Sequence, residues 1–598
     1  MNEKYRKTFT VFKWFAGIVF MLFLCADAAS WYLSKRMRPA IMRELKDLVL
    51  HSTDSLYSIN FSTVNTNFLF GNASVLDVKI VPDTNIYNKL VRLKRAPNNI
   101  YEVRLKKVTI RNFHPYRFLI KKRIDINQLL FDHPSVVMIN KQLAFNDNKP
   151  LRPNKSPFAY ISKFLKGVSV RTIDLRDISF KYINKNRAVP ETDSLDRLNI
   201  TLKDWLIDAH SATDTTRIYL LKDVLIDLND YQFATPDSLY HININEFSFR
   251  ASTGQMNIKK FALVPRYDEM EFGRVAGFAK DRFNIQMSDI SLTGIDLPLY
   301  IKKQELFARE MNIANGYVSV FNNNELHPRG VERMGKFPHQ LLQTVKGKLT
   351  VEKLNLNNID LSYAEFDHDS KQKGKITFEN TSGTIFNATN EEKAKRKNHF
   401  MLASLQTQMM GQGQLAVEFR FDLTAKNGDF SYKGQLTNMN GSVLNRITKP
   451  LGMVQVKSGQ VKKLTFDIVA DNAGAKGTMD FAYQNLSIGL LKKVEGKNRL
   501  VKQGLISMLA NALVINPDNP NAKGDFIKAP INYTRDPTIS FFSFVWKTLF
   551  QGIKYTVGLT PKKEAEIEAQ INKFEQMKSD REARREARDK RHSLSRKR

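Results

Sequence analysis

Few residues of this chain have the types and spacing that catalysis or metal binding requires. Gly330–Phe337 reads GVERMGKF, which has the spacing of a phosphate-binding P-loop as far as Lys336. A P-loop places a hydroxyl next, to ligate magnesium, and Phe337 stands there instead. The ten histidines form no HExxH pattern, and no G-x-S-x-G nucleophile motif occurs. The cluster Asp367-His368-Asp369 could hold a cation, but its Ser, Lys and Gly neighbours indicate a loop. We therefore expect no catalytic residue, no metal site, no cofactor and no enzymatic activity.

The charge of the chain indicates an anionic neighbour. The net charge is +32, from 92 basic and 60 acidic residues, and nucleic acid and anionic lipid headgroups are the usual partners of such a balance. A generally basic envelope protein is the alternative. Basic residues alternate along the expected strands, and no zinc finger or RNP motif occurs, so we expect no nucleic acid as a partner. Cys25 is the one cysteine, which excludes a disulfide within the chain.

An N-terminal segment has the length and composition of a membrane anchor. Trp14–Leu33 is apolar apart from Asp27, and at about 1.5 Å per residue it spans a ~30 Å hydrocarbon core. A cleaved signal peptide is the alternative, because Ala26–Ala28 fits a cleavage site. The aromatic pair Trp31-Tyr32 and a basic stop follow directly, which favours an uncleaved helix. We expect the N-terminus in the cytoplasm and the body of the chain outside it.

The body contains two tandem copies of one pattern. The segment YEVRLKKVTIRNF, from Tyr101, has the same apolar positions as FNIQMSDISLTGI, from Phe283, and VSVRTIDLRDISFKY, from Val168, resembles LTVEKLNLNNIDLSY, from Leu349. These matches share an offset of about 180 residues, which indicates internal repeats. The alternative, generic β patterning, gives local similarity without a common spacing.

Within each copy the apolar residues follow a kinked strand pattern. An apolar-x-apolar-x-x order slips by one position after each pair, and a bulge or tight turn there would return the apolar side chains to one face. We expect a mostly β protein, with an elongated, repetitive and twisted sheet that has one apolar face. That face either closes into a packed core or stays open as a groove, and the sequence does not decide between the two. The candidate groove residues are Val103, Leu105, Val108, Ile110, Val170, Ile173, Leu175, Ile178, Phe180, Ile290, Leu292, Leu354, Leu356, Ile359 and Leu361.

The C-terminal part changes character. Arg499–Ile515 and Phe541–Leu559 have apolar residues at helical spacing, which predicts amphipathic helices. The second helix either caps the sheet or contacts a membrane surface. From Lys562 onward the chain is nearly all charged, which predicts a solvated helix. The candidate membrane-contact residues are Phe542, Val545, Trp546, Leu549 and Ile553.

These patterns divide the chain into seven parts. The expected parts are a cytoplasmic stub and transmembrane helix (1–35), a juxtamembrane helix or linker (36–56), β repeat unit 1 (57–236), β repeat unit 2 (240–418), a C-terminal β segment (419–495), amphipathic helices (496–560) and a charged helical tail (561–598).

The anchor, the repeats and one later stretch together resemble a known family. The repeats contain VTIRNF followed by IDINQLLFDHPSVVMI, and the stretch from Met410 begins MGQGQLAVEFRFDLTAKNGDF and runs to Lys493. These segments look like the AsmA-like proteins of Gram-negative envelopes. The resemblance covers most of residues 1–495 and is densest in 410–493. It implies a taco-shaped β-groove related to those of the bridge-like lipid-transfer proteins, an inner-membrane anchor with the body in the periplasm, and no catalytic residues.

The expected function is non-enzymatic. An apolar β-groove would bind phospholipids and support their transport between inner and outer membrane and outer-membrane biogenesis. Phospholipid, the inner membrane and other envelope proteins are the expected partners. The alternatives are an envelope scaffold with a fully packed β core and, less favoured, a basic nucleic-acid-binding protein. The chain is short compared with the proteins it resembles, which favours partial bridging or partner-assisted transfer over a one-molecule bridge.

Overall fold

The computed structural model describes most of the chain between residues 53 and 560. Strands make up 56% and helices 19% of it, against ~20–25% strand in an average soluble protein, so the protein is mostly β, as the sequence predicts. The described residues are 53–67, 70–146, 165–186, 190–211, 213–218, 220–326, 333–493, 500–502 and 515–560, with scattered positions at 39–51, 158, 162 and 562–584.

The predicted membrane anchor, Trp14–Leu33, lies outside the described residues, as do about half of the linker 36–56 and most of the charged tail. These parts stay predictions. Of the helices that the structure describes, none is both long and apolar enough to cross a membrane.

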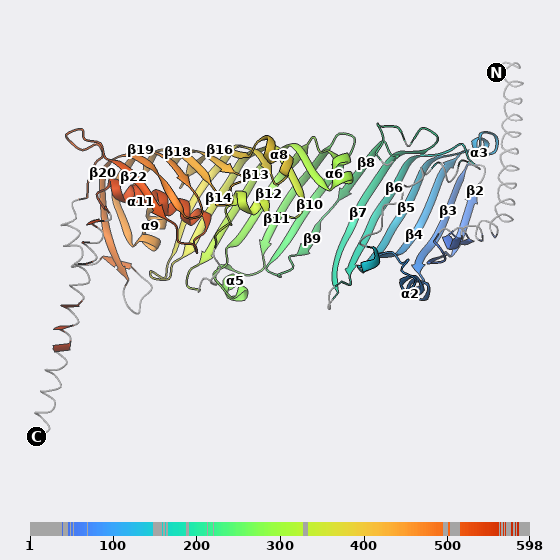
Figure 1. Cartoon of the computed structure of the whole chain (residues 1–598), viewed down its shortest axis with the longest axis horizontal. Helices are drawn as coiled ribbons and strands as arrows, with labels where there is room; N and C mark the ends of the chain where they lie inside the picture. Colours follow the sequence, from blue (N-terminus) through green and yellow to red (C-terminus); the bar gives the residue numbers. More distant parts are fainter. Residues whose placement is uncertain are drawn as a thin grey trace, which may run out of the picture. The chain divides into compact units, whose positions relative to one another are not determined.

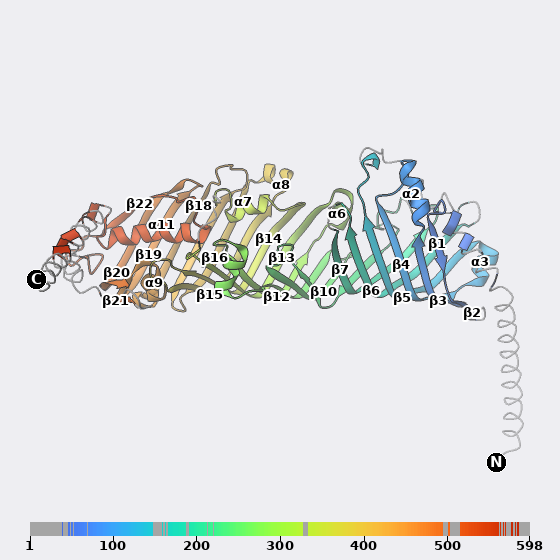
Figure 2. The same ribbon diagram turned by 90° about the horizontal axis from the view of Figure 1, so that it is seen from below.

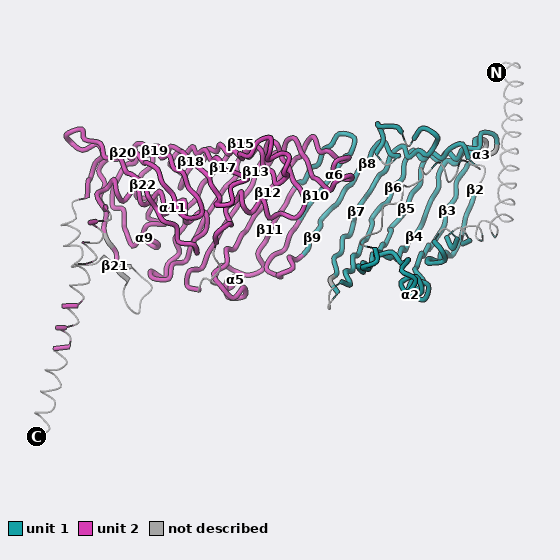
Figure 3. Tube along the Cα trace, in the orientation of Figure 1, with its two compact units in different colours: residues 1–233, 244–259 teal, residues 234–243, 260–598 magenta. Residues whose placement is uncertain are grey.

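The chain divides into two compact units (Figure 3). Unit 1 comprises Met1–Phe233 and Ile244–Lys259, and unit 2 comprises Ala234–Asn243 and Lys260–Arg598. The elements up to the end of the first unit are β1 (Tyr57–Asn60), β2 (Thr63–Asn67), β3 (Asn72–Pro82), α2 (Thr84–Arg92), β4 (Asn99–Phe113), α3 (Pro115–Lys121), β5 (Arg123–Asn140), η1 (Ala144–Asn146), β6 (Gly167–Asn184), β7 (Glu191–Ile207), β8 (Asp223–Leu228) and β9 (Tyr231–Ala234) (Figure 1).

Strands β10 (Tyr240–Arg250) and β11 (Gln255–Pro265) contribute residues to both units. The remaining elements belong to unit 2: α5 (Glu269–Ala276), β12 (Arg282–Thr293), α6 (Leu297–Lys303), β13 (Glu305–Asn323), α7 (Pro338–Gln343), β14 (Lys348–Phe366), β15 (Lys373–Thr389), α8 (Glu392–Lys397), β16 (Phe400–Met409), β17 (Gly413–Asp422), β18 (Phe430–Asn440), η2 (Gly441–Leu444), α9 (Asn445–Gly452), β19 (Val454–Ala470), β20 (Gly474–Lys493), β21 (Leu500–Lys502), β22 (Lys528–Thr534) and α11 (Phe541–Thr556).

The strands form one mixed sheet that is not closed. It contains 21 strands, and β21 pairs only with the end of β20. Most neighbouring strands are antiparallel, but β5 and β6 are parallel, and so are β13 and β14. A parallel pair needs a crossover connection, and the crossover from β13 to β14 contains α7.

Seven elements recur in the same order along the chain. The series β3, α2, β4, α3, β5, β6, β7 is followed later by β11, α5, β12, α6, β13, β14, β15, with the parallel pair at the same place in both. Residues with positive φ recur too: Gly71 and Gly254 precede the first strand of each series, and Lys122 and Gln304 end the second helix. Two copies of one sequence pattern would produce this recurrence. The limits 57–236 and 240–418 themselves stay predictions.

The kinks that the sequence predicts are β-bulges. The register between β6 and β7 shifts on either side of Ile178, and that between β14 and β15 shifts on either side of Ile359. The preceding residues, Asp177 and Asn358, have φ of 53° and 48°, a conformation that Asp and Asn tolerate better than most residues. The extra residue changes the phase of the alternation, so apolar residues before and after it share a face. The predicted bulges are confirmed in these two strands.

Two predictions for the C-terminal part are corrected. Leu500–Lys502 of the expected helix forms strand β21, and residues 503–514 lie outside the described part. The expected helical region 496–560 also contains β22, in which Ala529 and Ile531 alternate with exposed residues and are buried. This segment is short and interrupted by Pro530, which hid its two-residue period.

Strand β22 pairs with β20 on one side, and a side chain bonds its other side. The Gln551 side chain of α11 accepts a hydrogen bond from the Asn532 backbone N–H (3.3 Å) and donates one to the Asn532 carbonyl oxygen (3.1 Å). Two positions earlier, Pro530 has no N–H to offer.

We predict that Gly383→Ala opens the sheet locally. Gly383 in β15 has φ of 153°, and an added Cβ would lie 2.0 Å from the Ser404 carbonyl oxygen of β16. The strain of such a residue costs ~1–3 kcal/mol. Native-state hydrogen exchange should therefore show lower protection in β15 and β16. Gly489→Ala in β20 is the control, because its Cβ would meet only the flexible Lys457 side chain. Equal exchange in the two variants would contradict the prediction.

Candidate functional site

In unit 1, apolar residues of neighbouring strands lie opposite one another. Ile110 of β4 pairs with Leu129 of β5, and Leu129 pairs with Ile173 of β6. Ile173 in turn pairs with Leu202 of β7. Directly paired residues project to the same face of a sheet, so these side chains form one row across four strands. Two parallel rows are Val75–Val108–Phe131–Leu175–Ile200–Ile226 and Ile80–Val103–Val136–Phe180–Leu195.

The opposite face of these strands is polar. Arg111, Gln128, Thr172 and Lys203 form a row on it. Asp174, also on this face, accepts hydrogen bonds from the Gln128 amide (2.5 Å) and the Thr201 hydroxyl (3.1 Å). The sheet of unit 1 therefore has one apolar and one polar face.

Unit 2 continues the same arrangement over more strands. Its longest rows cross ten strands, from β12 to β22. They are Ile290–Ile313–Leu356–Gly383–Leu405–Val417–Gly434–Phe466–Met479–Ala529 and Leu292–Met311–Leu354–Ile385–Ala403–Phe419–Tyr432–Ile468–Gly477–Ile531.

Most of the predicted groove residues lie in these apolar rows. Val103, Val108, Ile110, Ile173, Leu175 and Phe180 lie in the rows of unit 1, and Ile290, Leu292, Leu354 and Leu356 lie in those of unit 2. Contact of these residues with lipid stays a prediction.

The two apolar faces differ in what covers them. In unit 1, α2 and α3 lie at opposite ends of the strands (Figure 1), and of the helices described there none crosses the rows. Side chains in the rows, such as Ile173, Leu175 and Phe180, are only half-buried. In unit 2, α11 packs against β20 and β22 and runs along the sheet (Figure 2).

The face of α11 that packs on the sheet consists of Phe544 followed by small residues. Phe544, Thr548, Gly552 and Thr556, at four-residue spacing, are its most buried positions. An added Cβ at Gly552 would lie 2.9 Å from Met479 Sδ, so glycine allows the close approach. The Thr548 and Thr556 hydroxyls donate to the carbonyl oxygens four residues earlier, at 2.8 and 3.0 Å, which satisfies their donors within the helix.

The predicted membrane-contact residues of α11 flank this buried face. Val545, Trp546, Leu549 and Ile553 are partly buried against the core, whereas Phe542 is 47% exposed. Of the two interpretations that the sequence left open, capping of the sheet is the one that the structure shows for these four. Membrane contact stays untested.

An aromatic cluster holds the start of α11. The Phe337 ring lies 5.1 Å from that of Phe430 and 5.8 Å from that of Phe544. The buried Arg535 guanidinium stacks on Phe337 at 4.4 Å, and it donates to the carbonyl oxygens of Arg333 (2.9 Å) and Ile539 (3.1 Å). Phe337, which excluded a P-loop in the sequence, is thus a core residue.

A large apolar cavity lies between α11 and β18–β20. Its volume is about 570 Å³, within the ~300–1,000 Å³ of small-molecule sites. The sheet contributes Leu436, Met439, Val456, Val461, Leu464, Phe481 and Leu486, and the helix contributes Trp546, Phe550, Ile553 and Lys554. Lys554 is the one charged residue among the described residues that line it.

Most of the residues that line this cavity were not predicted from the sequence. The segments that line it, such as Phe430–Leu436 and Leu464–Ala470, have strict two-residue alternation, so that signal could have identified them. The buried positions of α11 lie one residue before the predicted contact residues Val545, Leu549 and Ile553. Hydropathy identifies large apolar residues and does not identify small buried ones.

Polar groups end the apolar face of unit 2. Glu365 of β14 pairs with Asn322 of β13. Burial raises the pKa of the Glu365 carboxyl, which accepts hydrogen bonds from the Tyr363 hydroxyl (2.8 Å) and the Asn324 amide.

The predicted loop at Asp367 is also present. The Asp367 carboxylate accepts hydrogen bonds from the backbone N–H groups of Asp369 and Ser370, which is a turn-forming arrangement.

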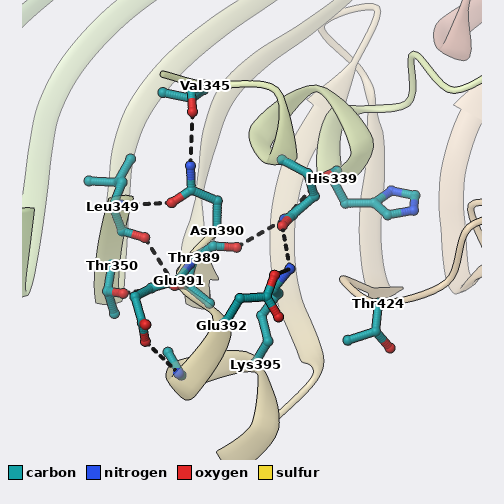
Figure 4. A network of polar contacts seen from close by, with 12 residues as sticks. His339, Val345, Leu349, Thr350, Thr389, Asn390, Glu391, Glu392, Lys395 and Thr424 are labelled. Carbon is teal, nitrogen blue, oxygen red and sulfur yellow. Dashed lines mark hydrogen bonds and ion pairs between the residues drawn. The ribbon is translucent and has the colours of Figure 1, made fainter. Parts of the chain in front are cut away.

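A polar network fixes the start of β14 (Figure 4). Asn390 donates to the Val345 carbonyl oxygen (3.2 Å) and accepts from the Leu349 N–H (2.6 Å), while the Thr350 and Thr389 hydroxyls lie 2.7 Å apart. These bonds join the crossover after α7 to the end of β15. None of these residues lines the cavity.

Comparison of the chain with protein-family models gives no match, and comparison with curated proteins gives none either.

We predict that His339 makes unit 2 sensitive to acid. The ring lies between Phe337 and Phe421 and is 1% exposed, and burial lowers its pKa from 6.5 to about 4. Between these values the unfolded chain binds a proton that the folded protein does not, so stability falls as pH decreases. From pH 7 to 4.5 the loss is about 2–3 kcal/mol. Urea unfolding of His339→Phe should lack this part of the pH dependence, and an unchanged pH dependence would contradict the prediction.

Proposed function

We propose that the protein is a non-enzymatic lipid-binding protein of a bacterial envelope, which holds phospholipid acyl chains against its apolar β face. The observation that carries the proposal is the apolar face of unit 1. Its rows cross the strands without interruption, and no helix described there covers them. Exposed contiguous apolar surface of this kind is typical of a binding surface.

The proposed mechanism is passive. Each buried CH₂ contributes ~0.8 kcal/mol, so a two-chain lipid leaves a bilayer at useful rates only where another apolar surface receives its chains. The bulges at Ile178 and Ile359 keep the apolar residues on one face along each bent strand, which supports a groove with headgroups left in water.

The proposed location is the inner membrane of a Gram-negative bacterium, with the body in the periplasm. Its support is the apolar segment Trp14–Leu33 and the resemblance of the repeats and of residues 410–493 to AsmA-like proteins. Within that setting, the groove would take part in phospholipid transport towards the outer membrane, together with other envelope proteins.

A scaffold with a packed β core is the second candidate. The observation that favours it lies in unit 2, where α11 and its neighbours bury a large cluster that includes Tyr432, Met479 and Phe544. A sheet filled in this way needs no lipid. Lipid analysis of the purified protein separates the two candidates, because the scaffold should carry none.

We predict that Ile173→Glu lowers the lipid that co-purifies with the protein. A carboxylate in the apolar row disfavours an acyl chain there by more than ~1 kcal/mol, so lipid per protein should fall about fivefold or more by mass spectrometry of extracts. Leu175→Glu tests the same face in β6, and Leu356→Glu tests the apolar face of unit 2 in β14. Thr172→Glu is the matched control, since Thr172 is the next residue on the polar face. An unchanged amount of lipid per protein in all three variants, with unaltered circular dichroism, would contradict the proposal.

A further inference from the structure

The cavity beneath α11 has the size of one acyl chain. Its volume of about 570 Å³ lies within the ~300–1,000 Å³ of small-molecule sites, which is enough for one long acyl chain. Its walls are aliphatic and aromatic side chains from β18–β20 and α11.

A second, more polar pocket adjoins this cavity. It has a volume of about 480 Å³ and shares Phe550, Lys554 and Leu559 with the first. Asn532, Gln551 and Lys547 provide its polar lining. Among the described residues that line the two pockets, two are lysines and none is acidic.

Lys554 stands where the two pockets meet. It extends from the last turn of α11, and its Nζ lies 5.7 Å from the centre of the Phe550 ring. Lys547 interacts electrostatically with Glu365 and Asp536, neither of which lines this pocket. The site thus combines an apolar slot with a cation at its boundary, which complements an amphiphile with a negative headgroup.

We propose that the cavity beneath α11 binds a single-chain anionic amphiphile, a long-chain carboxylate, with the chain between the helix and β18–β20 and the carboxylate at Lys554. The inference deepens the proposed lipid-binding function and rests on it in naming acyl chains as ligands. It concerns a site separate from the apolar face of unit 1 and accepts one chain in place of two.

The four tryptophans of the chain allow the two sites to be observed separately. Trp546 lines the cavity, and Trp205 of β7 lies three residues from Leu202, which belongs to an apolar row of unit 1. The others are Trp14 and Trp31. In the full chain, replacing Trp14, Trp31 and Trp205 by Phe leaves Trp546 as the reporter, whereas replacing Trp14, Trp31 and Trp546 leaves Trp205.

The test is fluorescence quenching by 9,10-dibromostearate added to delipidated protein below its aggregation concentration. Bromine quenches tryptophan only at short range, so Trp546 should be quenched saturably at one ligand per chain. Absent or non-saturable quenching of Trp546 overturns the inference. Quenching of Trp205 by dibrominated phosphatidylglycerol reports on the apolar face of unit 1, so failure of either site is seen independently of the other.

Variants define the chain slot and the headgroup position. Val456→Phe fills the cavity and should weaken dibromostearate binding at least tenfold, whereas Val469→Phe, on the same strand β19 but 59% exposed, should not. Because Val456→Phe could perturb folding, headgroup competition provides a second test. Palmitate should displace dibromostearate at least tenfold better than hexadecyltrimethylammonium does, and Lys554→Gln should reduce that difference. Equal displacement by both ions in the unaltered protein overturns the assignment of a negative headgroup.

Discussion

Strand pairing that sets apolar residues opposite apolar residues is the constraint on which the structure depends. A slip of one residue in any strand would turn its apolar side chains to the polar face. The bulges therefore have to occur at matching levels in neighbouring strands. Asp177 in β6 and Arg197 in β7 both have positive φ beside the Ile178–Leu198 pair. In β14 and β15, Asn358 and Asn380 likewise have positive φ beside the Ile359–Thr381 pair. The continuity of each row is thus a property of adjacent strands together.

The same kind of apolar face serves two purposes in the two units. In unit 1 its side chains are half-buried, and hydrogen bonds such as that from Gln128 to Asp174 satisfy groups on the polar face. In unit 2 the helix α11 covers the sheet. The small residues Thr548 and Gly552 let the helix approach the sheet closely. Larger side chains lie on either side of them. The cavity lies in the space that results.

Much of the fold was predictable because its signals are local and repeated. Alternation of apolar residues, slipped by one at Ile178 and Ile359, specifies strands and bulges from the sequence alone, and the faces of the candidate groove residues follow from it. Strand β22 and the true packing face of α11 did not follow. A short strand with Pro530 has too few alternations, and a helix face of threonine and glycine is buried for its shape, which hydropathy does not record. The cavity could not be predicted either, since its size depends on the distance between α11 and the sheet.

The bonds from Gln551 to both backbone groups of Asn532 have a consequence for self-association. A bare edge strand is a template on which another chain can add, which leads to filaments or aggregates. Here a side-chain amide occupies the position of the next strand's peptide group, and Pro530 withholds a donor two residues away. Strand addition at β22 would have to displace these bonds, which disfavours polymerisation at this edge.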